Sequence, residues 1–264
     1  MLVLKYAALA TVEDLFRYKK SGFILDEFPG YTHDQWGIKA HNRPWIEEAG
    51  SFSKGQKIIE VGGAYSQLAR YLAEKYDLEA WVGDDFGMTS GAMIWSRWGN
   101  PMELQVKYPS VNYIYENFGT FSCKYPDNYF DRIFSVSTLE HIPRKEIVDV
   151  FKDMHRCLKS GGRQLHTIDI YTHPPHTNIV STIIEKWPFI NKRAGKYSSE
   201  IHEWIELIED SGVKIDTSIP SSIQLMDRRI LVESPDVVYR FYPPNNEPKA
   251  YQPNASLLCI IEDR

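Results

Sequence analysis

The sequence has 264 residues, of which 43% are hydrophobic and 25% are charged, and its formal net charge is -5 at pH 7. This composition is typical of a globular domain and excludes a disordered chain. The negative charge gives no general attraction to nucleic acid, so we expect a small-molecule partner. The longest apolar run near the start, residues 6–10, is too short for a membrane span or a secretory signal. The three cysteines are widely spaced, which predicts neither disulfides nor a zinc site and favours the cytoplasm; the oligomeric state stays open.

The first 56 residues show one clear helix signal. Thr11 and Asp14 are spaced as a capping box, which predicts a helix that includes Leu15 and Phe16. An aromatic and polar stretch follows. We expect residues 1–56 to form a helical or lid segment ahead of a main domain over residues 57–264.

Strand and helix signals alternate through the middle of the chain. The β-branched run Lys57–Val61 ends in a glycine turn, and apolar residues at helical spacing follow from Leu68 to Tyr76. Further strands are predicted at residues 79–83, 111–115, 131–136, 163–170 and 256–261, with helices at 145–158 and 201–212. This alternation predicts parallel strands joined by helices. Residues 171–197 and 218–254, rich in proline and aromatic side chains, are expected to be lid-like insertions beside a substrate site.

The glycine turn is the first candidate for ligand binding. Gly62 and Gly63 occupy the first strand-to-helix turn, which lies close to the ligand in open parallel sheets. Asp85, at the end of the second strand, is placed to accept hydrogen bonds from both hydroxyls of a ribose. A turn of this kind also occurs for plain backbone geometry, and Asp84 with Asp85 equally fits a solvated helix start. The order of the remaining motifs has to decide between these interpretations.

Three segments in this order resemble the class I S-adenosylmethionine-dependent methyltransferases. They are Ile-Ile-Glu-Val-Gly-Gly-Ala-Tyr-Ser at residues 58–66, the segment 125–143 with its Leu-Glu-His-Ile sequence, and His-Arg-Cys-Leu-Lys-Ser-Gly-Gly at residues 155–162. The resemblance covers roughly residues 55–170. It implies a Rossmann-like three-layer α/β sandwich, with a mostly parallel sheet of about seven strands and an antiparallel last strand. It also implies that S-adenosylmethionine binds between residues 58–66 and 131–143.

The resemblance assigns cofactor contacts residue by residue. Glu60 would anchor the turn and the methionine amino group, Asp85 would bind the ribose and Phe86 would flank the adenine. The other implied cofactor-binding residues are Gly62, Gly63, Ala64, Ser66, Asp84, Glu116, Asn117, Phe118, Ser135, Val136 and Leu139. Where the family often has Gly-x-Gly-x-Gly, Ala64 and Ser66 replace two glycines. Both are small, so we still expect the cofactor to bind.

Methyl transfer from a sulfonium needs an aligned acceptor and, for many acceptors, a base that removes a proton. The catalytic candidates are His141, Asp169 and His173, which are expected beyond the fourth and fifth strands. The candidates for binding the acceptor are Tyr31, His33, Trp36 and His176. Asp169 with the two nearby histidines could instead bind a divalent ion, but the spacing matches no metal signature, so we expect no metal.

The sequence therefore predicts an enzyme that O-methylates a small hydroxylated metabolite, such as a sugar or glycan precursor. N-methylation of a small molecule is the second hypothesis. A non-catalytic binding or scaffold protein that retains the fold is the third. A dehydrogenase that binds NAD would explain the glycine turn but not the Leu-Glu-His-Ile segment.

Overall fold

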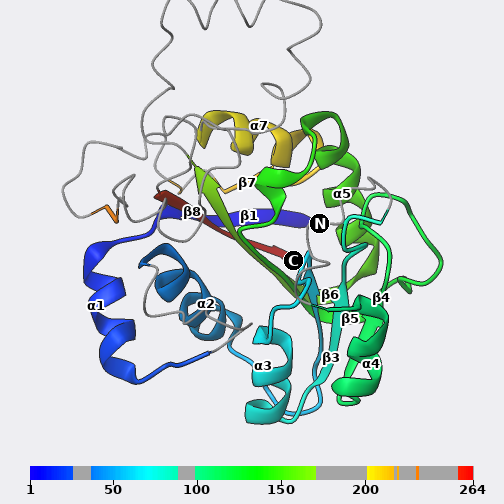
Figure 1. Cartoon of the computed structure of the whole chain (residues 1–264). Coiled ribbons are helices and arrows are strands. Elements are labelled where there is room, and N and C mark those ends of the chain that lie inside the picture. The colour runs from blue at the N-terminus through cyan, green and yellow to red at the C-terminus, as the bar shows by residue number, and fades with distance from the viewer. Residues whose placement is uncertain are drawn as a thin grey trace, which may run out of the picture.

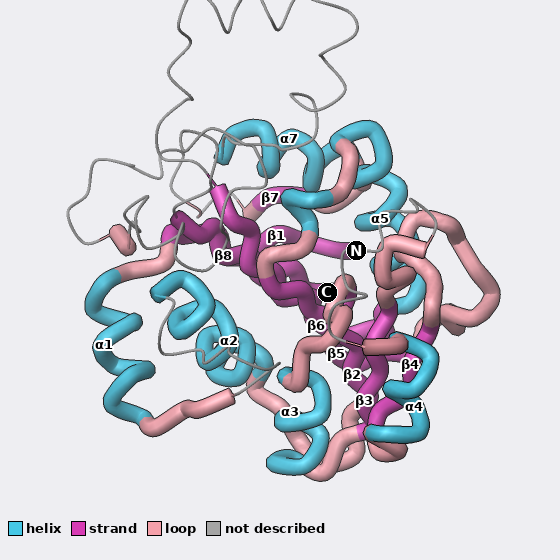
Figure 2. The backbone as a smooth tube through the Cα atoms, viewed as in Figure 1, coloured by secondary structure: helices cyan, strands magenta, loops and turns pink. Residues whose placement is uncertain are grey.

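The computed structural model describes residues 1–25, 37–88, 99–170, 201–216, 219, 230–231 and 255–263. Its described strands form one eight-stranded sheet in the order β4-β3-β2-β5-β6-β8-β1-β7. Helices cover both faces of this sheet, with α1, α2 and α3 on one side and α5 and α7 on the other (Figure 1). The twisted sheet lies between the two helical layers in Figure 2, as expected for a three-layer α/β sandwich. No helix in the described part is long and apolar enough to cross a bilayer.

Five strands form the parallel part of the sheet. They are β2 (Lys57–Val61), β3 (Glu79–Gly83), β4 (Val111–Ile114), β5 (Phe130–Val136) and β6 (Leu158–Ile170). The helices between them are α3 (Leu68–Tyr76), α4 (Leu104–Lys107) and α5 (Arg144–Cys157), with short 3-10 turns at Pro101–Glu103 and Leu139–His141. Strand order reverses between β2 and β5, and ligands bind at the carboxyl ends of the strands at such a point.

The remaining strands complete the sheet beyond β6. β8 (Ala255–Asp263) runs antiparallel to β6 and to β1 (Leu2–Leu9), which confirms the predicted antiparallel last strand. The two-residue β7 (Lys214–Ile215), which follows α7 (Ile201–Asp210), pairs parallel to β1. Part of the segment expected to be helical or a lid is therefore a strand inside the sheet, and the described sheet has eight strands rather than about seven. The division of the chain at residue 56 stays a prediction.

The two faces of the sheet pack against separate cores because successive strand side chains point to opposite sides. Ile58, Phe134 and Leu165 face α1 (Val12–Ser21), α2 (Gly37–Gly50) and α3. Their neighbours Ile59 and Ile133 face α5 and α7. The expected helix start at Thr11 is present, since its hydroxyl accepts the Asp14 N–H at 3.1 Å.

Helix α2 was not predicted from the sequence, because Pro44 lies inside it and glycine stands at both ends. Its carboxyl end is held near the amino ends of β5 and β6, where Arg132 and Arg163 donate to the carbonyls of Gly50 and Ala49. The helix packs along β5 and β6, so its first turns lie over the carboxyl ends of these strands. In this way α2 brings Lys39 and Asn42 to the edge where a ligand is expected.

Candidate active site

The glycine turn is clamped between two strands. Gly62 has a φ of +66°, and its N–H donates to the Gly83 carbonyl at 2.8 Å. A Cβ on Gly62 would lie 1.9 Å from Cγ2 of Thr138, whose hydroxyl donates to the Gly62 carbonyl. Only glycine fits both this conformation and this contact. The turn after β2 therefore lies directly against the segment that follows β5.

The carboxylates of Glu60 and Asp84 accept hydrogen bonds from backbone N–H groups in and next to the turn. The buried Glu60 carboxylate accepts the Ala69 N–H at 3.2 Å and so caps the first turn of α3. Asp84 accepts the N–H groups of Ala64, at 2.9 Å, and Phe86, at 2.5 Å. Burial raises the pKa of Asp84 to about 6. These hydrogen bonds let Ala64 adopt a φ of +43° without a glycine, so the turn keeps its shape despite the replacement.

Asp85 lies at the carboxyl end of β3 beside Asn117, which follows β4. Its carboxylate accepts the Gly87 N–H at 2.8 Å, and its own N–H donates to Oδ1 of Asn117 at 3.4 Å. The ring of Phe86 packs edge-on against Tyr65, with centroids 5.5 Å apart, and lies 5.8 Å from Tyr115. The end of β3 thus combines a carboxylate with an aromatic wall, which is the chemistry a nucleoside requires.

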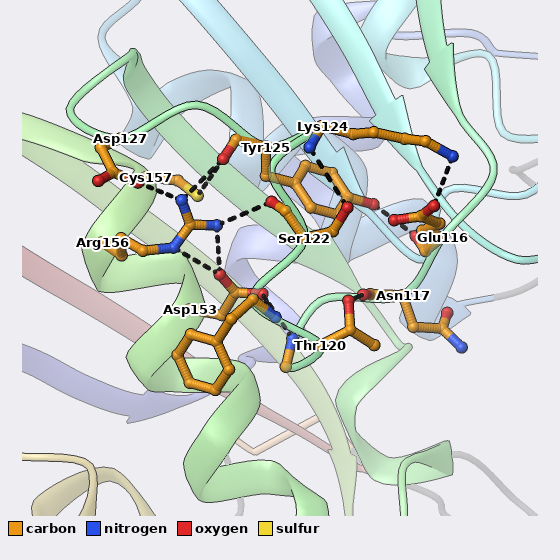
Figure 3. Close-up of polar contacts among 12 residues, drawn as sticks. Glu116, Asn117, Thr120, Ser122, Lys124, Tyr125, Asp127, Asp153, Arg156 and Cys157 are labelled. Carbon is orange, nitrogen blue, oxygen red and sulfur yellow. Dashed lines mark hydrogen bonds and ion pairs between the residues drawn. The ribbon is translucent and has the colours of Figure 1, made fainter.

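Two predicted adenine-edge residues make contacts with other parts of the protein. Phe118 is buried and stacks on Tyr125 at a centroid distance of 4.1 Å, so it belongs to the core. Glu116 forms an ion pair with Lys124, as Figure 3 shows. Of the three residues predicted after β4, Asn117 is the one in contact with Asp85.

The loop between β4 and β5 is fastened to α5 by two residues that the sequence analysis did not single out. Asp153, which is fully buried, accepts the N–H groups of Gly119 at 2.9 Å and Phe121 at 3.0 Å. Arg156 donates to the Tyr125 carbonyl at 2.8 Å and also bonds Asp153 (Figure 3). This loop carries Asn117, so α5 fixes the position of the contact to Asp85.

The carboxyl ends of β5 and β6 form a second polar cluster with α2. Asp169 accepts the Ser137 hydroxyl at 2.8 Å and the Asn42 amide at 3.4 Å, and the Lys39 ammonium lies 3.4 Å from its other oxygen. Lys39 and Asn42 were missed because helix α2, which carries them, was not predicted. Glu140, in the 3-10 turn after β5, is 2% exposed, and neither of its oxygens accepts a hydrogen bond.

The other residues predicted after β5 have different surroundings. The side chain of His141 is 62% exposed, and its Nε2 lies 3.7 Å from Oε1 of Glu140. The hydroxyl of Ser135 is engaged by His166 at 2.9 Å, on the face of the sheet covered by α5, so this side chain does not border the turn. Burial lowers the pKa of His166 to about 3, which keeps that imidazole neutral. Leu139 lies in the core and Val136 is partly buried at its margin.

Five predicted residues lie outside the described residues, namely Tyr31, His33, Trp36, His173 and His176. Within the described ranges, no three His, Cys, Asp or Glu side chains are close enough to hold a metal ion. The structure thus brings together the turn after β2, the ends of β3 and β4, and the cluster of β5, β6 and α2.

Comparisons with known proteins agree with this arrangement. Residues 59–165 match a family model described as a methyltransferase domain. Phosphoethanolamine N-methyltransferase 2 of Caenorhabditis elegans is 28% identical over 123 residues, which cover 47% of this chain and 26% of that protein. Sarcosine/dimethylglycine N-methyltransferase of Halorhodospira halochloris is 24% identical over 163 residues, which cover 59% of this chain and 54% of that protein. The chain therefore spans between a quarter and about half of the length of these relatives.

Solved structures of methyltransferases have a similar fold. Phosphoethanolamine N-methyltransferase 2 of Haemonchus contortus superposes with a TM-score of 0.56 at 17% identity, covering 95% of this chain and 57% of that one. Residues 59–165 therefore match a methyltransferase domain, and the sheet with its clamped turn has the fold expected of the class I S-adenosylmethionine-dependent methyltransferases. Within this class, its sequence is similar to N-methyltransferases of small molecules.

Proposed function

We propose that the protein uses S-adenosylmethionine to methylate the nitrogen of a small polar amine. The observation that carries this proposal is the similarity in sequence to phosphoethanolamine and sarcosine/dimethylglycine N-methyltransferases, which extends over half or more of the chain. It favours the second sequence hypothesis, N-methylation, over the expected O-methylation. The chain spans only part of these relatives, so the acceptor belongs to the proposal.

The cofactor would lie across the switch point of the sheet. In this arrangement Asp85 binds the ribose hydroxyls, because its carboxylate ends β3 beside the turn and beside Asn117. Phe86 and Tyr115 offer ring surface for the adenine. The turn from Gly62 to Ala64 faces the methionine end, with Glu60 acting through the turn. Asp84 is bound to backbone N–H groups and therefore supports the turn rather than the ligand.

The reacting methyl group would lie near the carboxyl ends of β5 and β6. The acceptor nitrogen attacks the methyl carbon in line with the breaking carbon–sulfur bond, and the electron pair of that bond stays on sulfur as the sulfonium becomes a thioether. Alignment supplies much of the rate. An amine that enters as an ammonium ion first has to lose a proton to expose its lone pair. His141 is the described candidate to accept that proton, because its imidazole is exposed at this edge.

Several predicted roles remain part of the proposal. Asp169 is engaged by Ser137, Asn42 and Lys39, so its role is to hold these groups. His173 remains a catalytic prediction, and Tyr31, His33, Trp36 and His176 remain predictions for binding the acceptor. The cytoplasm remains the predicted location.

The test is methyl transfer from S-adenosylmethionine to a panel of acceptors. Phosphoethanolamine, sarcosine and dimethylglycine represent the amines, and glycerol and glucose represent hydroxyl acceptors. We expect S-adenosylhomocysteine as a product with at least one amine and with neither hydroxyl acceptor. Transfer confined to the hydroxyl acceptors would replace the proposal with O-methylation. No S-adenosylhomocysteine binding by folded protein would favour a non-catalytic protein.

A further inference from the structure

Glu140 has surroundings that are unusual for a carboxylate. It is 2% exposed, and neither Oε1 nor Oε2 has a hydrogen-bond partner. Burial raises the pKa of Glu140 well above its ordinary value, and the nearby Asp169 raises it further. A buried carboxylate without hydrogen bonds lowers the stability of a fold by several kcal/mol in order of magnitude. Such a group persists in a folded protein as the neutral acid, or as the carboxylate where a ligand supplies the missing donors.

Two acidic side chains, Glu140 and Asp169, share one nearby cation, Lys39, at the methyl-transfer edge. Lys39 on α2 lies 3.4 Å from Oδ2 of Asp169, and Asp169 also accepts from Ser137 and Asn42. Asp169 therefore accepts hydrogen bonds from several side chains, whereas no side chain donates to Glu140, whose nearest donors are the backbone N–H groups of Glu140 itself and of Asp169. The imidazole of His141 lies 3.7 Å away, beyond the length of a hydrogen bond.

We propose that Glu140 is the recognition group for the acceptor, and that it binds the ammonium end of a small organic amine. This inference rests on the proposed function and names the chemistry that selects the acceptor. An ammonium ion has several N–H donors and one positive charge. It can therefore donate hydrogen bonds to both oxygens of Glu140 and balance the charge of the carboxylate. A neutral hydroxyl brings one donor and no charge, so the same site discriminates against alcohols.

The position of Glu140 also gives the proton a path. The ammonium ion bound by Glu140 donates one N–H proton to Nε2 of His141, which lies at the exposed end of the cluster. The freed lone pair forms the new nitrogen–carbon bond while the carbon–sulfur bond breaks and its electrons remain on sulfur. The product is a methylated ammonium ion, a thioether and a protonated His141, so atoms and charge balance. Glu140 binds the ammonium ion before the proton leaves and the methylated ammonium ion after the new bond forms.

The experiment compares binding of a cation with binding of its neutral counterpart. Ethanolamine and ethylene glycol are titrated into protein saturated with S-adenosylhomocysteine, using wild type, Glu140→Gln and the control Glu146→Gln, an exposed glutamate at the start of α5. Loss of one charge-assisted contact corresponds to about 10- to 100-fold weaker binding. We expect that loss for ethanolamine in Glu140→Gln alone, with unchanged affinity for S-adenosylhomocysteine.

Two results would overturn the inference. One is equal affinity for ethanolamine in wild type and Glu140→Gln, and the other is binding of Mg²⁺ rather than ethanolamine at this residue. Failure of the proposed function is distinguishable, because it appears as loss of S-adenosylhomocysteine binding or of methyl transfer in the wild type itself.

A second measurement needs no Glu140 variant. Tetramethylammonium cannot lose a proton, so its binding reports the charge of the site. Its affinity for wild type falls about tenfold per pH unit below the pKa of Glu140. Lys39, Asp169 and His141 are the other titratable groups that face Glu140. Repeating the titration in His141→Asn removes the contribution of the imidazole, and affinity that is flat with pH in both proteins would contradict the inference.

Discussion

The carboxylates in the two halves of the candidate site differ in the hydrogen-bond donors that surround them. At the ends of β2 and β3, the carboxylates of Glu60, Asp84 and Asp85 accept N–H groups from their own or a neighbouring turn. At the ends of β5 and β6, Asp169 depends on side chains of a distant helix, and Glu140 has no hydrogen bond. The first half is thus held by backbone hydrogen bonds within the described residues, and we propose that a bound cation completes the second.

The two halves meet where Gly62 contacts Thr138, and we expect a substitution there to have the largest effect on stability. Gly62→Ala adds a methyl group at a φ of +66° and within 1.9 Å of Thr138, so we expect a loss of about 4 kcal/mol in the free energy of unfolding. Gly55→Ala is the control, because its φ is +81° but its Cβ meets nothing within 4 Å. We expect that variant to lose about 1 kcal/mol. Urea denaturation measures both values, and equal losses would show that the contact with Thr138 is not tight.

The pH dependence of stability tests the first half. The pKa of Asp84 is about 6 in the folded protein and 3.8 when unperturbed. Between these values the unfolded chain has released its proton and the folded chain has kept it, so this group lowers stability as pH rises from about 4 to 6. The change amounts to about 3 kcal/mol. We expect the difference in stability between wild type and Asp84→Asn to shift by that amount over this range, and a constant difference would contradict the assignment.

Cofactor affinity isolates the ribose contact. Asp85→Ala removes the carboxylate proposed to accept two hydroxyls, and we expect about 100-fold weaker binding of S-adenosylhomocysteine. Calorimetric titration measures it, with Asp149→Ala, an exposed aspartate of α5, as the control. Equal affinity for S-adenosylhomocysteine in both variants would show that the ribose does not bind at the end of β3.

The loop between β4 and β5 provides the smallest of the four effects. Asp153→Ala leaves the Gly119 and Phe121 N–H groups without their acceptor, and we expect a loss of about 2 kcal/mol in stability. Asp127→Ala removes an exposed partner of the same Arg156 and is expected to change stability by less than about 0.5 kcal/mol. Thermal unfolding compares the two variants. Similar melting temperatures would mean that the loop is held by packing alone.

The same contrast explains what could be predicted from the sequence. The turn after β2 and the end of β3 are local motifs, in which spacing along the chain determines the hydrogen bonds, and their positions were predicted to within a residue. Lys39 and Asn42 reach Asp169 across more than a hundred residues, through a helix whose glycines and Pro44 conceal its period. The strand Leu2–Leu9 was missed for a related reason, because a short apolar run has no periodicity that distinguishes a buried strand from other buried segments.

The directions in which individual side chains point at the strand ends could not be predicted from the sequence. Ser135 and Phe118 were placed near the right strand ends, yet one bonds His166 and the other stacks on Tyr125. A shift of one residue at the end of a strand turns a side chain to the opposite face, and the motif alone does not fix that register.

The central claim is that this edge of the sheet transfers a methyl group to nitrogen. The most direct measurement uses S-adenosylmethionine whose methyl group is labelled with ¹³C. The protein is incubated with this cofactor and an equimolar mixture of phosphoethanolamine, dimethylglycine and glycerol. NMR then identifies the acceptor atom that carries the labelled methyl group. The account predicts a labelled N-methyl signal in wild type that is reduced at least tenfold in Glu140→Gln when the amines are below saturation. A labelled O-methyl signal in wild type, with no N-methyl signal, would contradict it.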